Sequence, residues 1–324
     1  MLQPEDHIKL KDKFREDIRN GLTAIPKFLP SKYLYDQRGN RIFQQIMNMP
    51  EYYLTDCELE IFRNAKSEFL SHFQAGDSDF HLIEFGAGDG TKTKVLLEYF
   101  TREGAGFIYN PIDISGKIIE ELSGKLRALY PELKVDPVNR EYFDALDEIS
   151  VQCCGRKVIL FLGSNIGNFR SQESLDFFRA ISGRLNPGDL LLTGFDLKKD
   201  PDLILKAYND PAGITSDFNI NLLERINREL EADFNPDAFF HCPVYDPGKG
   251  EARSYLVSRR KQEVRIGKLS MTVCFSNWET IFMEVSKKYD IHQIRDLAEN
   301  TGFSVVDNFY DSRRYFVDSL WKVS

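Results

Sequence analysis

Metal-binding and redox motifs are missing from this sequence of 324 residues. Its five cysteines form no C-x-x-C pair, and the adjacent Cys153 and Cys154 are poorly spaced to chelate one ion. The five histidines are scattered, with no helical i, i+4 pair and no H-E-x-x-H sequence. We therefore expect buried structural thiols, no metal and no metal hydrolase.

The sequence also lacks a long apolar run and an excess of basic residues. No window approaches the roughly 18 to 20 apolar residues that a membrane-spanning helix needs. The opening MLQPEDHIKLKDKF alternates charges where a secretory signal needs an apolar stretch. A formal net charge of −8 argues against nucleic-acid or anionic-membrane partners. We expect a cytoplasmic protein with a small-molecule partner, whose oligomeric state stays open and is compatible with a monomer.

What the sequence contains from Phe80 onward is a regular alternation of strand and helix patterns. Helical segments with apolar residues three and four apart separate short apolar runs. Such runs are typical of buried parallel strands, with helices covering both faces of the sheet. The expected strands are 81–85, 106–114, 157–163 and 189–197. This pattern predicts an α/β, Rossmann-like domain.

The alternation stops after Asp196 and resumes near Ile291. Residues 198–240 are mostly helical in pattern, and residues 252–288 alternate apolar and polar side chains as antiparallel strands do. The last part of the chain predicts one helix and two closing strands. We therefore expect one domain from 57–196 with 288–324, and a second lobe from 1–56 with 197–287.

A glycine-rich turn follows the first of these strands. Residues 82–93, LIEFGAGDGTKT, read as a strand, a turn and a helix start with the pattern E-x-G-x-G-x-G. Glycines there let the backbone approach a ligand, and free amides at the helix start favour negative groups. A dinucleotide fingerprint needs Gly or Ala where Thr91 stands. The turn therefore resembles the S-adenosylmethionine (SAM) loop of class I methyltransferases, and an NAD-dependent oxidoreductase is less favoured.

Acidic and aromatic residues follow the next two expected strands. Asp113 stands where a carboxylate would accept hydrogen bonds from ribose hydroxyls. Glu141 and Tyr142 fall at the next expected strand end, where a polar contact and a ring face could bracket an adenine. The alternative is that all three are ordinary surface residues of strand-end loops.

Four further stretches point to a substrate class. They are SKYLYDQRGNRIF with MPEYYLTDCE near the start, FLGSNIGNF at 161–169, AYNDPAGITSDFNINLLERINREL at 207–230, and MEVSKKY at 283–289. From about Gly21 to about Tyr289 the sequence resembles the histidine-specific methyltransferases of ergothioneine biosynthesis. These enzymes convert L-histidine to its N-α-trimethyl betaine, hercynine, by successive methylation.

The resemblance implies a class I SAM-dependent methyltransferase domain with a substrate-binding lobe built from the N-terminal segment and the insertion. Tyr52, or a water that it holds, becomes the candidate to take the proton of the α-amine. The positions carried over for the cofactor are Gly86, Lys92, Asp113, Glu141 and Tyr142, and those for the substrate are Tyr35, Tyr52, Asn168, Tyr208, Glu284 and Ser286.

These residue types suit a bound histidine. Asn168 and Tyr208 are neutral donors for the substrate carboxylate. Glu284 can accept an imidazole N–H while Ser286 matches the other ring nitrogen. The alternative for each is a structural role, as a helix cap, a half-buried core aromatic or an outward-facing strand residue.

Three departures from the family pattern bear on specificity. Glu141-Tyr142 stands where the family has Asp-Phe, and the glycine turn is closer to the general methyltransferase loop. Ser254 stands where a Met side chain helps to wall the imidazole pocket, which implies a larger or more polar pocket. Methylation of another amino acid such as tryptophan, and a non-catalytic binding homologue, remain the alternatives.

Overall fold

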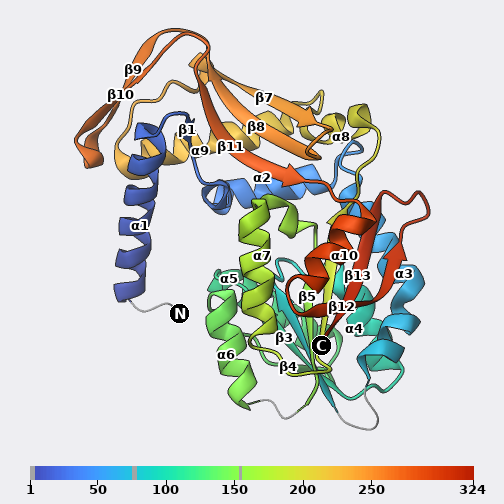
Figure 1. The fold of residues 1–324 in the computed structure, drawn as a ribbon. Coiled ribbons are helices and arrows are strands. Elements are labelled where there is room, and N and C mark those ends of the chain that lie inside the picture. The colour runs from blue at the N-terminus through green and yellow to red at the C-terminus, as the bar shows by residue number, and fades with distance from the viewer. Residues whose placement is uncertain (1–3, 75–78, 153–154) are drawn as a thin grey trace. The chain divides into compact units, whose positions relative to one another are not determined.

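The computed structural model describes residues 4–74, 79–152 and 155–324 and divides the chain into two compact units (Figure 1). Of the described residues, the first unit contains Leu54–Lys198 and Lys288–Ser324, and the second contains residues 4–53 and Lys199–Lys287. The chain therefore leaves the first unit after Lys198 and re-enters it at Lys288.

The first unit contains a seven-stranded sheet. Its strands are β2 (Phe80–Phe85), β3 (Phe107–Ile112), β4 (Lys134–Val135), β5 (Lys157–Phe161), β6 (Leu190–Asp196), β12 (Phe303–Tyr310) and β13 (Phe316–Val323). They lie in the order β12, β13, β6, β5, β2, β3, β4. β2 to β6 pair in parallel, whereas β13 is antiparallel to both neighbours. The predicted α/β class with a Rossmann-like sheet is confirmed.

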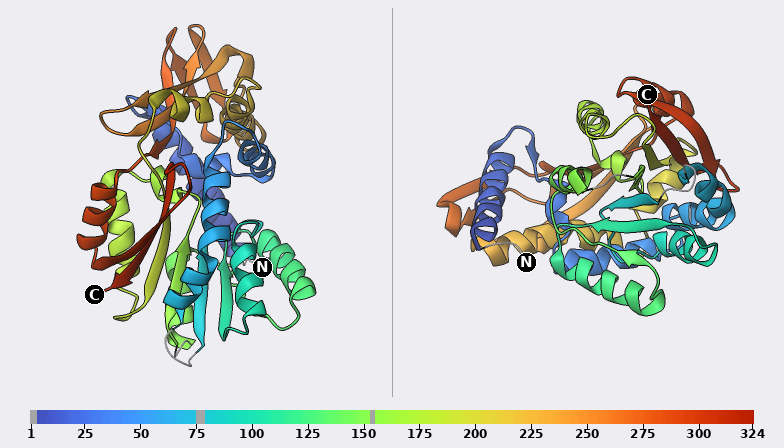
Figure 2. Two further views of the ribbon diagram at one scale, coloured as in Figure 1. Left: turned by 90° about the vertical axis from the view of Figure 1, so that its right-hand side faces the viewer. Right: turned by 90° about the horizontal axis from the view of Figure 1, so that it is seen from below.

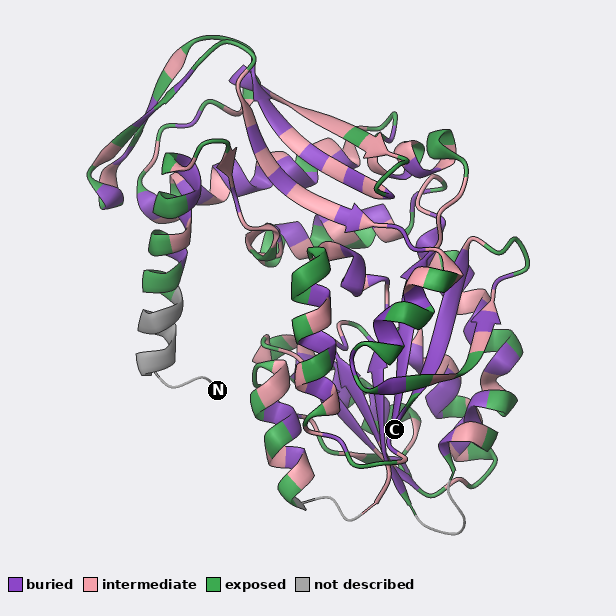
Figure 3. Ribbon diagram, viewed as in Figure 1, coloured by how far each residue is buried: buried purple, intermediate pink, exposed green. Residues whose placement is uncertain are grey.

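The central strands of this sheet are apolar because both faces are covered. Every residue of β5 and β6 is buried (Figure 3), as expected of parallel strands between helix layers. Helices lie on both sides of the sheet (Figure 2). They are α3 (Leu54–Phe73), α4 (Thr93–Arg102), α5 (Gly116–Leu129), α6 (Tyr142–Gln152), α7 (Ser171–Ser182) and α10 (Ile291–Glu299).

Two apolar layers hold these helices to the sheet. One cluster joins α6, α7 and α10 to the strands and includes Phe178 and Trp321, whose ring centroids are 4.9 Å apart. On α3 and α4, rings of Phe73 and Phe100 meet at 5.9 Å, and Phe73 also meets Phe80 of β2 at 6.1 Å. Aromatic pairs at these distances stabilise a core beyond the area that they bury.

The second unit combines helices with an antiparallel sheet. Its helices are α1 (Pro4–Thr23), α2 (Gln37–Met47), α8 (Pro201–Tyr208) and α9 (Ile214–Leu230). One sheet has the order β1 (Lys27–Phe28), β11 (Thr280–Lys287), β8 (Glu251–Ser258) and β7 (Phe239–Asp246), and a separate hairpin consists of β9 (Gln262–Ile266) and β10 (Met271–Phe275). A single apolar cluster joins residues of α1, α2, α9 and both sheets. The unit therefore has its own core.

The structure corrects the expected position of Glu141 and Tyr142. They do not lie at a strand end, because β4 covers only Lys134–Val135 and Tyr142 is the first residue of α6. Pro137 follows β4 closely, and the amides of its two neighbours, Asp136 and Val138, donate to Tyr109 and Pro111 of β3. A single bridge between Ile112 and Val138 continues the pairing beyond it.

The cysteines carry free thiols in three different surroundings. Cys57 is buried, Cys242 is half-buried and Cys274 is exposed. The expectation of buried thiols is wrong for Cys274, because alternation along β10 turns this side chain outward. Cys153 and Cys154 lie outside the described residues. In the part of the chain that the structure describes, no helix is long and apolar enough to cross a bilayer.

Candidate functional site

The glycine turn after β2 has a backbone that needs glycine. Gly86, Gly88 and Gly90 all have positive φ, at 68°, 54° and 67°, a region that other residues rarely adopt. An added Cβ on Gly86 would lie 2.9 Å from the Tyr142 hydroxyl, and one on Gly90 would lie 2.6 Å from a Leu122 methyl group. The loop therefore offers its backbone at a point where side chains have no room.

The acidic residue of the motif, Glu84, fixes the two ends of this loop. It is buried at the end of β2, and its carboxyl accepts hydrogen bonds from the Thr93 hydroxyl at 2.7 Å and from the Tyr109 hydroxyl. Burial raises the pKa of Glu84 to about 7, although both hydrogen bonds act in the opposite direction. Glu84 thus links β2 to β3 and to the first turn of α4.

Asp113 directly follows β3, beside the glycine turn. Its carboxylate accepts a hydrogen bond from the Ser115 amide at 2.8 Å. Burial raises its pKa, while the backbone amides of Ser115 and Gly88 favour the charged form. The next residue, Ile114, is apolar yet 59% exposed. A carboxylate and an uncovered apolar side chain thus stand together at this strand end.

Tyr142 and Glu141 join this group from the start of α6. The Tyr142 ring stacks on Phe85 with centroids 4.8 Å apart and planes at 1°, so one face of the ring is covered. Burial raises the pKa of the Tyr142 hydroxyl to about 12, and the charges of Asp113 and Glu141 add to the shift. Glu141 is exposed. The structure therefore brings Gly86, Asp113, Glu141 and Tyr142 together.

Lys92, the residue before α4, has a partner that the sequence did not reveal. Its ammonium forms an ion pair with Glu58 of α3. Glu58 is completely buried, whereas the Lys92 side chain is 21% exposed. Glu58 also accepts hydrogen bonds from the Gly163 amide, which follows β5. Lys92 thus lies at the same carboxyl edge of the sheet as the glycine turn.

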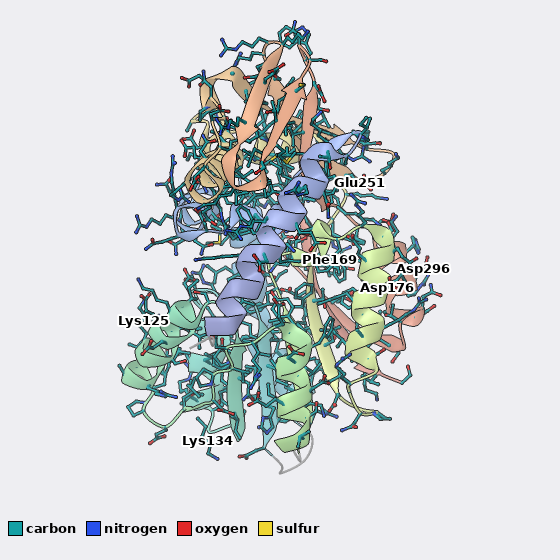
Figure 4. All side chains as sticks on the ribbon, turned by 90° about the vertical axis from the view of Figure 1, so that its left-hand side faces the viewer. Lys125, Lys134, Phe169, Asp176, Glu251 and Asp296 are labelled. Carbon is teal, nitrogen blue, oxygen red and sulfur yellow. The ribbon has the colours of Figure 1, made fainter. Side chains whose placement is uncertain are left out.

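Asn168 ends the 3₁₀ helix η2 (Asn165–Asn168), which follows β5. Asn168 is half-buried. The next residue, Phe169 (labelled in Figure 4), packs on Phe177 of α7 with ring centroids 5.0 Å apart. The predicted substrate residue Asn168 therefore belongs to the first unit, whereas the other five belong to the second.

In the second unit, a β-bulge orients the end of β11. The register with β8 shifts at Met283, after which Glu284 lies opposite Ser254 and Ser286 lies opposite Ala252. Opposite side chains in an antiparallel pair share one face. Without the extra residue, the alternation would turn Met283, not Glu284, to the face of Ser254. The bulge therefore places Glu284, and with it Ser286 two residues later, on the face of Ser254.

Polar partners surround this face. The Tyr208 hydroxyl, at the end of α8, donates a hydrogen bond to the Ser286 hydroxyl at 2.8 Å. Nε2 of His241 lies 3.1 Å from the Ser254 hydroxyl. Burial lowers the pKa of His241 to about 4, so this imidazole is neutral at pH 7. Tyr208 and Ser286 are thus in contact, and Ser254 is already engaged by His241.

Tyr35 and Tyr52 meet through a third aromatic ring. Phe43 of α2 contacts Tyr35 at 5.4 Å and Tyr52 at 6.3 Å, both edge to face. Phe218 of α9 packs on Tyr35 at 5.3 Å and on Phe43 at 5.8 Å. The two tyrosines are therefore neighbours in one half-buried aromatic cluster.

Sequence reasoning missed Ile114, Glu58 and His241. For Ile114 the sequence did contain a signal, because an apolar residue directly follows Asp113, the candidate ribose ligand. Glu58 had one too, because it shares the apolar face of α3 with Leu54 and Ile61. His241 had none, since a lone histidine on a strand is compatible with any surroundings.

Charged side chains at the described positions are not arranged for a metal ion. Among the side chains that the structure describes, in 11–74, 79–151 and 155–324, no three of His, Cys, Asp or Glu are grouped as a metal site would require. The carboxyl edge of the first sheet instead combines close backbone approach, one carboxylate and apolar surfaces. That set can hold a nucleoside-like group.

The raised pKa of Glu84 predicts a pH dependence of stability. Between its ordinary pKa of 4.5 and the folded value of about 7, the folded protein binds more protons than the unfolded chain. The free energy of unfolding should therefore fall as pH rises through this window, by up to about 1.4 kcal/mol per pH unit from this group. Urea unfolding of Glu84→Gln should lack this component.

The matched control is Glu98→Gln, which changes an exposed carboxylate of α4. It should keep the pH dependence of the unaltered protein. An identical pH dependence for Glu84→Gln and the unaltered chain would mean that Glu84 does not hold the extra proton.

Comparisons with known proteins show the family of this chain. The chain matches the family described as histidine-specific methyltransferase, SAM-dependent, over residues 14–323. It is 37% identical to a histidine N-alpha-methyltransferase of Mycobacterium tuberculosis (strain CDC 1551 / Oshkosh), over 85% of this chain and 84% of that protein. The corresponding protein of Mycolicibacterium smegmatis is 36% identical, with 89% and 88% covered.

A third relative is ergothioneine biosynthesis protein 1 of Schizosaccharomyces pombe, which is 31% identical over 87% of this chain and 37% of that longer protein. These matches extend across both units of the fold. The chain therefore belongs to the family of SAM-dependent histidine-specific methyltransferases.

Proposed function

We propose that this chain transfers methyl groups from SAM to the α-amino nitrogen of L-histidine and, by successive transfers, forms hercynine. The observation that carries the choice of histidine is the bulged end of β11, where Glu284 and Ser286 share one face beside Tyr208. An imidazole has two ring nitrogens, which a carboxylate and a hydroxyl can engage together.

The residues at the carboxyl edge of the first sheet fit SAM. When bound, SAM supplies a methyl group on a sulfonium sulfur. Asp113 would accept hydrogen bonds from the ribose hydroxyls, and the turn at Gly86 would approach the cofactor with its backbone. Tyr142 and Glu141 would hold the adenine, with Ile114 as an apolar contact. Lys92 completes the proposed set with an ammonium beside the same turn.

The substrate carboxylate needs donors that leave the amine free. We assign this role to the amide of Asn168 and the hydroxyl of Tyr208, which are neutral and so do not need a salt bridge. The Tyr208 hydroxyl donates to Ser286 in this structure. On substrate binding, the Tyr208 hydroxyl would donate to the carboxylate instead.

Methyl transfer from a sulfonium is an in-line displacement, so the protein has mainly to hold a neutral amine in line with the methyl carbon. The amine must first lose a proton, and we assign Tyr52 to relay it: its hydroxyl oxygen, or a water that it holds, accepts the proton while another proton passes on to solvent. The rings of Tyr35 and Tyr52 meet at Phe43 and provide flat apolar walls.

A second candidate substrate is a larger amino acid such as tryptophan. Ser254 supports it, because this small side chain is buried directly opposite Glu284, at a position that the family resemblance fills with Met. Against it, an indole would leave part of the polar face unpaired, which is costly for a buried carboxylate.

We further propose that the enzyme works in the cytoplasm on a free amino acid. Cys57, Cys242 and Cys274 are free thiols, as is usual where the compartment keeps cysteines reduced. The formal charge of −8 gives no general attraction to nucleic acids or anionic membranes. We propose a small-molecule substrate as its main partner, and neither nucleic acid nor a membrane.

The function predicts one product from a mixed pool. The purified enzyme, given SAM and the twenty amino acids with histamine added, should produce trimethylated histidine and S-adenosylhomocysteine (SAH), as seen by mass spectrometry. Histamine should react poorly because it lacks the carboxylate. A methylated tryptophan in place of histidine would establish the second candidate, and no SAH at all would identify a binding protein.

The proposed ribose ligand gives a separate prediction. Asp113→Ala should weaken SAM binding by about 1 to 3 kcal/mol, the range for losing a charged hydrogen-bond partner, and leave histidine affinity largely intact. Isothermal titration calorimetry measures both. Asp144→Ala, which removes an exposed carboxylate of α6, is the control. Equal SAM affinities of Asp113→Ala and this control would exclude the ribose role.

The polar face of β11 gives a prediction on specificity. Glu284→Ala should sharply reduce kcat/KM for histidine and relax the rejection of tryptophan, because discrimination by unpaired polar groups can reach roughly 10⁴-fold. Glu251→Ala (Glu251 is labelled in Figure 4) removes a carboxylate from the other face of the same sheet and should change neither value. Wild-type turnover of histidine by Glu284→Ala would refute the imidazole contact.

A further inference from the structure

We propose that Glu58 is a positioning residue of the cofactor site, whose carboxylate holds both the Lys92 ammonium and the Gly163 backbone in place. The inference rests on the proposed cofactor role of Lys92. Glu58 itself lies beneath the site, on α3, and acts through these two groups.

One carboxylate ties together two loops from different strands. Glu58 forms an ion pair with Lys92, which follows the glycine turn after β2. The Gly163 amide, which follows β5, donates to both carboxylate oxygens, at 2.8 and 3.1 Å. An added Cβ on Gly163 would lie 3.3 Å from Lys92 Nζ. The two loops therefore approach each other closely around Glu58.

The sheet leaves space for this carboxylate. Gly194 of β6 faces it, and an added Cβ there would lie 2.4 Å from Oε1 of Glu58. A side chain at position 194 would thus force Glu58 to move. Glycine in the interior of a strand often marks a place where another group approaches closely.

A second buried acid, Asp318 of β13, adjoins the pair. Asp318 lies opposite Gly194 and is completely buried. Among the described residues, no N–H or O–H group donates a hydrogen bond to it. Burial, together with the negative charge of Glu58, raises the pKa of Asp318 well above its usual range. Burial therefore favours the protonated form of Asp318, and Glu58 is the carboxylate that forms the ion pair with Lys92.

The charge of Glu58 consequently decides whether Lys92 stays in place. A buried ammonium without its partner is strongly disfavoured, so it would deprotonate or move toward solvent. Either change would remove a positive charge from the edge of the glycine turn. The loop at Gly163 would keep its partner if the replacement retained an acceptor oxygen.

The chain offers a matched control at the other edge of the sheet. Lys157, the first residue of β5, pairs with Asp189 at 2.9 Å, with side chains 1% and 5% exposed. Asp189 also accepts from the Lys157 amide at 2.8 Å. This pair has the charges of the Glu58 pair, and its lysine is buried more deeply than Lys92, but it lies at the amino ends of the strands. A substitution in this pair therefore shows what the loss of a buried ion pair does to stability without a change at the cofactor site.

The test measures SAH affinity by calorimetry and the KM values for SAM and histidine. Glu58→Gln keeps an oxygen for the Gly163 amide and removes the charge. It should weaken SAH binding by about tenfold to a hundredfold, as is usual for residues that orient a ligating group, and leave the KM for histidine unchanged. Asp189→Asn should lower stability and leave SAH affinity unchanged. Unchanged SAH affinity in Glu58→Gln would overturn the proposal.

A double variant keeps the test valid if Glu58→Gln alone does not fold. Glu58→Gln combined with Lys92→Met removes both charges and so leaves no unpaired ion. If Glu58 acts through Lys92, the double variant should bind SAH as weakly as Lys92→Met and no more weakly. If the losses of SAH affinity from the two substitutions were additive, Glu58 would not act through Lys92, and the positioning role of Glu58 would be overturned. Unchanged SAH affinity in Lys92→Met would instead refute the proposed cofactor role of Lys92, and the inference with it.

Discussion

The burial of Glu84 at the end of β2 is the constraint on which the cofactor region depends. Its carboxyl receives hydrogen bonds from Thr93 at the start of α4 and from Tyr109 of β3. A buried carboxyl without partners would be costly, so these three elements are held in one arrangement. The glycine turn between β2 and α4 therefore has fixed ends. Its backbone can then hold three residues at positive φ.

The residues proposed to hold SAM are arranged around that turn. Asp113 extends from β3, Tyr142 stacks on the last residue of β2, and Lys92 stands just before α4. A second buried carboxyl, Glu58, lies under the same edge. The two acids have different partners. Glu84 has only hydroxyl partners and a pKa raised to about 7, whereas Glu58 has an ammonium and an amide.

Much of this was predictable from the sequence, for identifiable reasons. Buried parallel strands need continuous apolar runs, so β2, β3, β5 and β6 were predicted within a few residues of their bounds. The glycine turn was predictable because few residues other than glycine adopt its backbone. β4 and α6 were not, because β4 is only two residues long and no strand pattern precedes the start of α6. The helices of the first 53 residues were also missed, because no strand patterns lie between them to mark where each helix begins and ends.

The sequence by itself determined the α/β fold class, the glycine turn and, through its resemblance to a family, the candidate site residues. These depend on local backbone requirements and on short motifs, which neighbouring residues encode. Tertiary structure alone decided the partners of these residues. Glu58 meets Lys92 across 34 positions and Gly163 across 105, and a bulge at Met283 sets the face of Glu284. No local pattern encodes such contacts, because they arise only when distant elements pack together.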